Sequence, residues 1–372
     1  MKIVLATGIY YPEIGGPALL VKELAQELKQ RGHEPLVLTY ANRRKHEPED
    51  FLVIRIYRSL KILNYFKYFL AALKNIAPTD QVVVFDTFSA ALPIAIASWF
   101  KNFEYAVRLG GDFLWETAVN KFGKQVTLTD YYRTRFKLTE VWYFLLIRFI
   151  FRRAKKLIAT AAYQQDLIEE HYGIHPVKFF LLPNAFPQVS IASPEAERKK
   201  QLIFAGRFTK LKNLGRLIES LAKIKDTDYK LLLVGEGPEE RNLRQEVLRL
   251  KLADRVIFTK PVFGNELDQL IRVSMWLILP SFSDISPNSV FRSIALGTPV
   301  LMTKHSGLPE VFGRHLFFLK YPLNTEELTT KLDFLLELDA DHYASVLHAL
   351  TKIDQSYGFK ELVDRFLLIV AL

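Results

Sequence analysis

The strongest constraint on the fold of this chain is an alternation of short apolar runs with amphipathic segments of helical period. The runs form two series, separated by the polar stretch QVSIASPEAERKK at residues 188–200. They lie at residues 2–7, 34–40, 81–85, 104–110 and 156–160, and then at 201–206, 230–235, 255–259, 275–280 and 298–303. Apolar runs that alternate with helices are typical of parallel strands covered on both faces. The sequence therefore predicts an α/β protein with two parallel sheets.

The polar stretch also marks a domain boundary. A chain of 372 residues is long for one ordinary core and suits two domains. We expect Rossmann-like domains over residues 1–187 and 188–355, and an amphipathic helix over 356–372. Ligands of open α/β sheets bind at the carboxyl ends of the strands, so we expect the two sheets to face each other across a binding cleft.

Composition narrows the class of protein further. The chain has no cysteine, which excludes disulfides and cysteine-ligated metals. Its first residues predict a strand and not a signal peptide, so we expect a cytoplasmic protein. Residues 55–74 carry five cations and no acid, and residues 132–156 carry eight cations and one acid, which leaves the rest of the chain at −2 against a total of +10. The positive charge therefore belongs to the N-terminal half.

A loop with two cations follows the first strand of the second series. In GRFTKLKNLGRLIES, Arg207 follows the strand-terminal glycine, and Lys212 precedes a helix that we expect to begin near Asn213. Two cations beside a helix N-terminus suit a phosphate or a diphosphate. The alternative is that both are solvated loop charges.

Two further loops are expected at the same edge of the second sheet. One follows the strand LLLV and contains Gly235. The other, within residues 280–311, contains Asp284 and a helix start near Asn288. The backbone N–H groups of Asn288, Ser289 and Val290 could bind phosphate oxygens there.

The N-terminal half contributes two candidate loops. Gly15 and Gly16 allow close backbone approach to a ligand, although an ordinary tight turn explains them equally. Asp112 follows a strand and two glycines, so it is a candidate to accept or orient an acceptor proton. The alternative for Asp112 is a helix cap. Trp115 and Glu116 could border a ligand, and Trp115 could equally belong to the core.

In this order the motifs resemble the retaining GT-B-fold glycosyltransferases of family four. The similar segments are YYPEIGGPALLVKELAQELKQRGHEPLVLT, AGRFTKLKNLGRLIES, LLLVGEGPEERNL and PSFSD…RSIALGTPV. The resemblance implies transfer of a sugar from a UDP- or GDP-linked donor to a saccharide or lipid-linked acceptor, in cell-envelope or polysaccharide synthesis. It also implies retention of configuration, an N-terminal acceptor domain, a C-terminal donor domain and a final helix that returns to the first domain.

The resemblance implies a role for each matching residue. Arg207 and Lys212 would hold the donor diphosphate, with Gly15, Gly16, Gly235, Asp284 and the start of the helix at Asn288 around the donor. Asp112 would lie next to the acceptor hydroxyl, and Trp115 and Glu116 could border the acceptor sugar. The eight histidines are scattered, and we expect no metal and no cofactor, with cations acting in place of a divalent ion.

One position departs from the family pattern. The donor motif normally carries two glutamates eight positions apart, and here Asp284 takes the first position and Arg292 the second. A guanidinium has no hydrogen-bond acceptor for ribose hydroxyls. Arg292 could pair with Asp284, contact a phosphate or weaken the donor site. The alternative function is therefore a non-catalytic, glycosyltransferase-like binding or partner subunit.

The two basic stretches suggest a membrane surface. In residues 60–74, one helical face carries Ile62, Phe66, Phe69, Leu70 and Leu73, with lysines around it. Basic, aromatic amphipathic helices suit an anionic membrane, although helices packed on the sheet would look the same. We therefore expect a peripheral position on the inner face of the membrane. Nucleic acid explains these stretches less well, because no recognised module appears.

Overall fold

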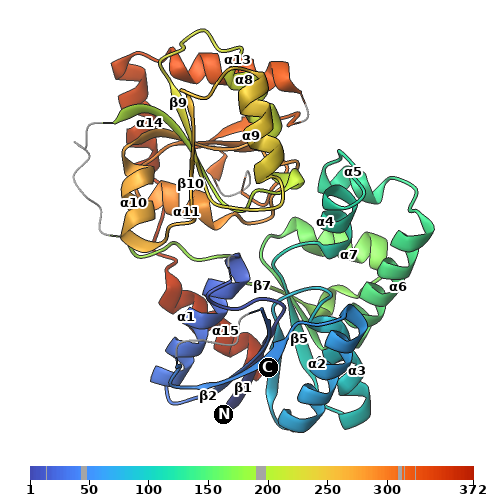
Figure 1. Cartoon of the computed structure of the whole chain (residues 1–372). Coiled ribbons are helices and arrows are strands. Elements are labelled where there is room, and N and C mark those ends of the chain that lie inside the picture. Colours follow the sequence, from blue (N-terminus) through green and yellow to red (C-terminus); the bar gives the residue numbers. More distant parts are fainter. Residues whose placement is uncertain (14, 43–47, 190–197, 309–311, 314, 323) are drawn as a thin grey trace. The chain divides into compact units, whose positions relative to one another are not determined.

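The computed structural model describes residues 1–372 except 14, 43–47, 190–197, 309–311, 314 and 323. The chain forms two compact units (Figure 1). The N-terminal unit consists of residues 1–116, 134–184 and 360–372. The C-terminal unit consists of residues 117–133 and 185–359. Each unit is thus built from segments that are not continuous in the sequence.

The described strands of the N-terminal unit form a seven-stranded parallel sheet with the order β3-β2-β1-β4-β5-β6-β7. They are β1 (Lys2–Thr7), β2 (Glu34–Ala41), β3 (Leu52–Tyr57), β4 (Gln81–Val84), β5 (Tyr105–Leu109), β6 (Lys156–Ala159) and β7 (Phe179–Leu181). The inner strands are buried almost throughout, which explains their continuous apolar sequences.

The helices of this unit cover both faces of the sheet. They are α1 (Gly16–Gln30), α2 (Lys61–Asn75), α3 (Ala91–Lys101), α4 (Phe113–Asn120, whose last turn belongs to the other unit), α6 (Leu138–Arg153), α7 (Tyr163–Tyr172) and α15 (Phe359–Ala371). Helices α1 and α15 lie on one face, and α2 and α3 lie on the other (Figure 1). The chain passes through α1 from β1 to β2 in one direction across the sheet, and through α2 from β3 to β4 in the other direction. Because such crossovers are right-handed, the two helices lie on opposite faces of the sheet.

The last described helix, α15, completes the core of the N-terminal unit. The Phe366 side chain is fully buried, and its ring centroid lies 6.5 Å from that of Phe85. The Lys156 Nζ donates a hydrogen bond to the Ile369 carbonyl at 2.7 Å. The Arg31 guanidinium of α1 pairs with the Asp364 carboxylate. Residues 360–372 therefore belong structurally to the sheet formed by the first half of the chain.

The described strands of the C-terminal unit form a six-stranded parallel sheet with the order β10-β9-β8-β11-β12-β13. They are β8 (Lys199–Ala205), β9 (Lys230–Val234), β10 (Val256–Thr259), β11 (Ser274–Leu279), β12 (Val300–Thr303) and β13 (Phe317–Leu319). The helices are α5 (Leu128–Tyr132), α8 (Leu214–Leu221), α9 (Glu240–Arg249), α10 (Gly264–Arg272), α11 (Asn288–Ala295), α13 (Thr325–Leu336) and α14 (Ala340–Thr351). The strand order reverses direction at β8, which is where ligands bind in such sheets.

The prediction of two Rossmann-like parallel sheets is confirmed. The segment 117–133 was not expected in the C-terminal unit, where the Leu128 N–H donates to the Ser283 hydroxyl at 2.8 Å. Among the described residues, no helix has the length and apolar character needed to cross a lipid bilayer.

Candidate active site

Two neighbouring loops at the carboxyl ends of β8 and β9 are joined by their backbones. The Gly206 N–H donates to the Val234 carbonyl at 3.0 Å, and the Phe208 N–H donates to the Glu236 carbonyl at 2.9 Å. Gly235 has a φ of +147°, and a Cβ atom there would lie 2.0 Å from the Gly206 carbonyl oxygen. A glycine at 235 is therefore required for the two loops to approach each other.

Arg207 projects from this fixed loop into solvent. Its neighbour Phe208 is fully buried, and the Phe208 ring contacts the rings of Phe204 and Phe258 with centroid distances of 6.2 Å each. The Arg207 side chain is exposed and makes no hydrogen bond or ion pair with the part of the chain that the structure describes. The buried Phe208 thus fixes the backbone that presents a free guanidinium.

Lys212 lies at the end of a short 3₁₀ turn, Lys210–Lys212, and forms an ion pair with Asp284. The two side chains are 19% and 14% exposed. The Asp284 carboxylate also accepts a hydrogen bond from the Ser281 hydroxyl at 3.2 Å. Lys212 follows β8 and Asp284 follows β11, and these two strands are adjacent. The Lys212 ammonium is therefore held at the strand-order reversal by a carboxylate from the neighbouring loop.

Asn213 ties this loop to the rest of the sheet edge. It has a φ of 57°, it is buried, and helix α8 begins directly after it. The Asn213 Nδ2 donates to the Pro280 carbonyl at 3.1 Å and to the Pro322 carbonyl at 2.5 Å. The loops after β8, β11 and β13 are thus held together by one buried amide.

Helix α11 begins at Asn288, as the sequence predicts, with Pro287 as its N-cap residue. The Val290 N–H donates to the Pro287 carbonyl at 3.0 Å, and the Val290 side chain is buried. This N–H is therefore already used within the turn, and its binding of a phosphate stays a prediction. The same role for the amides of Asn288 and Ser289 stays a prediction.

Arg292 pairs with a residue that sequence reasoning missed. The Arg292 guanidinium contacts the Asp268 carboxylate, and its Nη2 donates to the Gly264 carbonyl at 3.1 Å. Both acceptors belong to α10. Of the alternatives considered for Arg292, pairing with Asp284 is wrong in this structure, because Asp284 pairs with Lys212. Arg292 instead joins α11 to α10.

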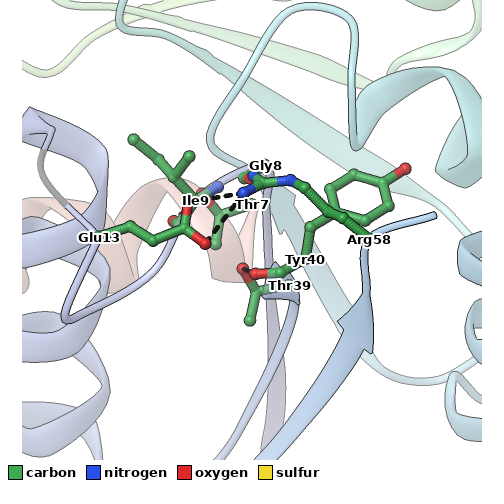
Figure 2. A network of polar contacts seen from close by, with 7 residues as sticks. All are labelled: Thr7, Gly8, Ile9, Glu13, Thr39, Tyr40 and Arg58. Atoms are coloured by element: carbon green, nitrogen blue, oxygen red, sulfur yellow. Dashed lines mark hydrogen bonds and ion pairs between the residues drawn. The ribbon is translucent and has the colours of Figure 1, made fainter. Parts of the chain in front are cut away.

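In the N-terminal unit, Arg58 holds the loop that follows β1 (Figure 2). Its Nη1 donates to both carboxylate oxygens of Glu13, at 3.0 and 2.8 Å, and its Nη2 donates to the Gly8 carbonyl at 2.8 Å. The guanidinium also lies over the Tyr40 ring, 5.8 Å from its centroid. One cation of the basic stretch 55–74 therefore has a structural role.

The same loop contains Gly15 and Gly16. A Cβ atom on Gly15 would lie 2.4 Å from Cδ1 of Ile9, so close packing within the loop already favours a glycine. Gly16 is the first residue of α1, with Pro17 in its first turn. The approach of these glycines to a donor stays a prediction.

The three predicted acceptor-side residues lie at the start of α4. The Asp112 Oδ1 accepts a hydrogen bond from the Trp115 N–H at 2.8 Å, which is the helix-cap arrangement. The Trp115 side chain belongs to the core, since the residue is 2% exposed. Glu116 is half-buried beside Gly111, where an added Cβ would lie 2.5 Å from the Glu116 carboxylate. Their roles toward an acceptor stay predictions.

Sequence reasoning did not select Asp86, which follows β4 at the reversal of the first sheet. Its Oδ1 accepts hydrogen bonds from the N–H groups of Phe88 and Ala90, both at 2.9 Å, and its Oδ2 accepts one from the Ser89 hydroxyl at 3.0 Å. Burial raises the pKa of the Asp86 carboxyl, although these donors oppose the rise. The sequence signal that could have identified Asp86 is an acidic residue directly after the apolar run at residues 81–85.

The described residues contain no group of three or more His, Asp or Glu side chains arranged to hold a metal ion. The expectation of a metal-free site overlooked two Asp-x-Asp triplets, at residues 226–228 and 339–341. Asp226 accepts a hydrogen bond from Lys200 at 2.9 Å, and Asp339 caps α14 through the His342 N–H. Both triplets are engaged in local structure.

Family models match nearly the whole chain in two parts. The model described as Glycosyltransferase Family 4 matches residues 14–187, and the model described as Glycosyl transferases group 1 matches residues 187–347. The two matches meet within three residues of the boundary between residues 184 and 185 that separates the compact units.

Curated relatives and solved structures agree with this match. N-acetyl-alpha-D-glucosaminyl L-malate synthase of Bacillus anthracis is 25% identical over 81% of this chain and 79% of the relative. Alpha-monoglucosyldiacylglycerol synthase of Streptococcus pneumoniae is 22% identical over 86% of this chain and 75% of the relative. The crystal structure of Anabaena HepE in complex with UDP-glucose superposes with a TM-score of 0.75, at 18% identity, covering 100% of this chain and 99% of that chain.

Proposed function

Because the chain belongs to the group 1 glycosyltransferases of GT-B fold, we propose that it transfers a sugar from a UDP- or GDP-linked donor to a saccharide or lipid-linked acceptor. The Anabaena structure that shares this fold was solved with UDP-glucose, which supports a nucleotide-diphosphate donor. One curated relative is named for a glucosyldiacylglycerol product, which supports a lipid-linked acceptor and a place in cell-envelope or polysaccharide synthesis.

The observation that carries the proposal is that two cations, Arg207 and Lys212, follow β8 at the carboxyl edge of the second sheet, with Lys212 held there by Asp284. When the bond between the sugar and the nucleotide breaks, negative charge grows on the departing diphosphate. A cation already held in position stabilises that charge without reorganisation during the step. Lys212 meets this requirement because Asp284 holds it. The buried Phe208 fixes only the backbone of Arg207, whose exposed guanidinium has no partner to give up among the described residues.

In this mechanism Asp284 positions Lys212. Its carboxylate keeps the ammonium at one point of the sheet edge, and the hydrogen bond from Ser281 keeps the carboxylate in place. The cations supply electrostatic stabilisation that a divalent ion supplies in other transferases, and we propose a metal-independent reaction on that basis. Both curated relatives are named for alpha-configured sugars, which supports retention from an alpha-linked donor such as UDP-glucose.

The test compares Arg207→Ala and Lys212→Ala with Lys210→Ala, an exposed lysine of the same turn. Nucleotide release is measured across UDP-, GDP- and ADP-sugars, with melting temperature as the control for folding. We expect each site variant to lose about 100- to 1,000-fold in rate, the usual effect of removing one stabiliser of developing charge. Lys210→Ala should keep the wild-type rate. Wild-type rates in both site variants would contradict the proposal.

A further inference from the structure

Helix α2 exposes several large apolar side chains. Its fully buried side chains are Tyr68 and Ala72, and the Tyr68 hydroxyl donates to the Leu38 carbonyl at 2.7 Å. The opposite face carries Ile62, which is 85% exposed, and Phe66, which is 54% exposed. A helix that only covers a sheet buries its large apolar side chains. We therefore expect the exposed apolar side chains of α2 to contact something other than the core of this unit.

The end of α3 extends this exposed face. Trp99 and Phe100 are 68% and 71% exposed. Ring contacts run from Phe66 to Phe69 at 6.4 Å, from Phe69 to Phe100 at 5.6 Å and from Phe100 to Trp99 at 6.2 Å. Figure 1 shows α2 and α3 side by side on the outside of the first sheet, and the Lys101 Nζ of α3 donates to the Leu73 carbonyl of α2 at 2.7 Å. We name the exposed apolar side chains of this surface, Leu60, Ile62, Leu63, Phe66, Leu70, Trp99 and Phe100, the α2–α3 ridge.

Cations surround the ridge, and its two helices contain no acid. Helix α2 carries Lys61, Lys67 and Lys74, and α3 ends with Lys101. Lys61 and Lys74 are exposed and make no ion pair with the described residues, and Lys67 bonds only to the Ser59 hydroxyl at 3.2 Å. The ridge therefore combines exposed aromatic rings with uncompensated positive charge.

The second basic stretch, which the sequence analysis treated as equivalent, uses its cations differently. Arg148 donates to the Tyr172 carbonyl at 3.1 Å, Arg153 donates to the Ser98 hydroxyl at 2.9 Å, and Lys155 pairs with Glu104 at 2.7 Å. Helix α6 does expose Trp142, but the cations of its C-terminal end serve the packing of the unit. Apolar exposure and uncompensated charge thus coincide at the α2–α3 ridge.

We infer that the α2–α3 ridge docks the protein on an anionic lipid surface. Aromatic and aliphatic side chains enter the boundary between headgroups and acyl chains, and lysines beside them meet the lipid phosphates. An anionic surface is chosen because the cations are uncompensated and both helices lack acids. The inference goes beyond the proposed sugar transfer, because docking requires no donor and its failure would leave the transfer chemistry intact.

The first experiment measures binding of the full chain to vesicles, by co-sedimentation. Vesicles contain either phosphatidylcholine alone or phosphatidylcholine mixed with phosphatidylglycerol. The variant Lys61→Gln/Lys67→Gln/Lys74→Gln is compared with Lys223→Gln/Lys230→Gln/Lys251→Gln, a matched set of exposed lysines in the C-terminal unit. We expect the wild type and the matched set to bind the mixed vesicles, and the ridge variant to bind about 100-fold more weakly, since each cation near the surface contributes about fivefold.

The second experiment locates the contact by tryptophan fluorescence. Of the four tryptophans, Trp115 and Trp276 are buried and give a constant background, whereas Trp99 and Trp142 are exposed. Mixed vesicles should shift the emission of Trp142→Phe to shorter wavelength, because Trp99 enters the lipid boundary, and should leave Trp99→Phe unshifted.

Three outcomes would overturn the inference. The first is an emission shift that survives in Trp99→Phe and disappears in Trp142→Phe. The second is absence of binding to mixed vesicles, and the third is equal binding of the wild type and the ridge variant to these vesicles. The inference would also be overturned if the wild type did not bind lipid but formed a dimer that Phe66→Ser/Phe100→Ser abolishes. The ridge would then be assigned to contact with a second copy of the chain. Melting temperature and nucleotide release in the absence of lipid serve as controls for folding.

Discussion

Substituting Gly235 by alanine tests whether the two loops of the candidate donor site must touch. The added Cβ would lie 2.0 Å from the Gly206 carbonyl oxygen and 3.1 Å from a ring carbon of Phe208. Ordinary contacts begin at 3.4 Å, so one backbone must move by about 1.4 Å. Gly206 precedes Arg207, so this movement displaces the cation that is proposed to meet the diphosphate.

The size of the effect follows from these distances. Overpacking against backbone costs about 1–3 kcal/mol, and a non-glycine residue at a φ of +147° costs a further 1–3 kcal/mol or so. For a domain of this size, 1 kcal/mol lowers the melting temperature by about 2–4 °C, so a total of about 2–6 kcal/mol corresponds to a decrease of roughly 4–24 °C. Displacement of a positioned group by about 1 Å lowers the rate about 100-fold.

The assay pairs Gly235→Ala with Gly215→Ala, and measures melting temperature and nucleotide release for both. Gly215 lies in α8, and a Cβ atom there would meet no atom within 4 Å. Alanine at 215 should leave the rate unchanged and stabilise the unit by up to about 1 kcal/mol. Wild-type melting and wild-type turnover in Gly235→Ala would refute the reasoning, because the loops would then not depend on their contact.

Three further predictions concern other parts of the chain. Arg292→Ala leaves the half-buried Asp268 carboxylate without its ion-pair partner, so the free energy of unfolding should fall by about 1–3 kcal/mol. Adding Asp268→Asn to this variant should restore much of the loss, and equal melting temperatures of the single and double variants would argue against the ion pair. Burial raises the pKa of the Asp86 carboxyl in the folded state, so the stability of the protein should fall as pH rises through that raised pKa. The melting temperature of Asp86→Asn should not show this decrease, and parallel pH profiles of the wild type and the variant would contradict the prediction. Deletion of residues 360–372 removes the buried Phe366, and hydrogen exchange of the first sheet should accelerate strongly, whereas unchanged protection would contradict the role given to α15.

The strands that lie inside the sheets could be predicted from the sequence, as could the edge strand β10, whereas the other three edge strands could not. Runs such as residues 2–7 and 81–85 are buried on both faces, which forces a continuous apolar sequence. The missed strand β3 lies at an edge, is mostly exposed or half-buried, and carries Arg55. The missed strands β7 and β13 contain three residues each, which is too short for a period to appear.

The chemistry of the candidate site could be predicted by residue type but not by pairing. Lys212 and Asp284 were both selected, yet their ion pair joins residues 72 positions apart and depends on which strands are adjacent. The partner of Arg292 comes from α10, which carries no motif. A pattern identifies which side chains reach a sheet edge, whereas their mutual contacts depend on loop geometry that local sequence does not encode.

The orientation of α2 is a similar case. Its aromatic residues fitted a core-facing helix and a membrane-facing helix equally well in the sequence. The structure shows which side chains face the core: Tyr68 and Ala72 form the buried strip, and Phe66 lies outside it. Tyrosine can be attached to a sheet through its hydroxyl, which a hydrophobicity pattern does not register.

The discontinuity of the N-terminal unit governs the order of events on the ribosome. Its sheet is translated early, but the position filled by Phe366 stays empty until residues 360–372 emerge, after the entire C-terminal unit has been synthesised. The usual sequence, in which the first-translated domain closes first, is therefore reversed. Until then, the first sheet of a nascent chain lacks the apolar cover that α15 provides in the folded unit.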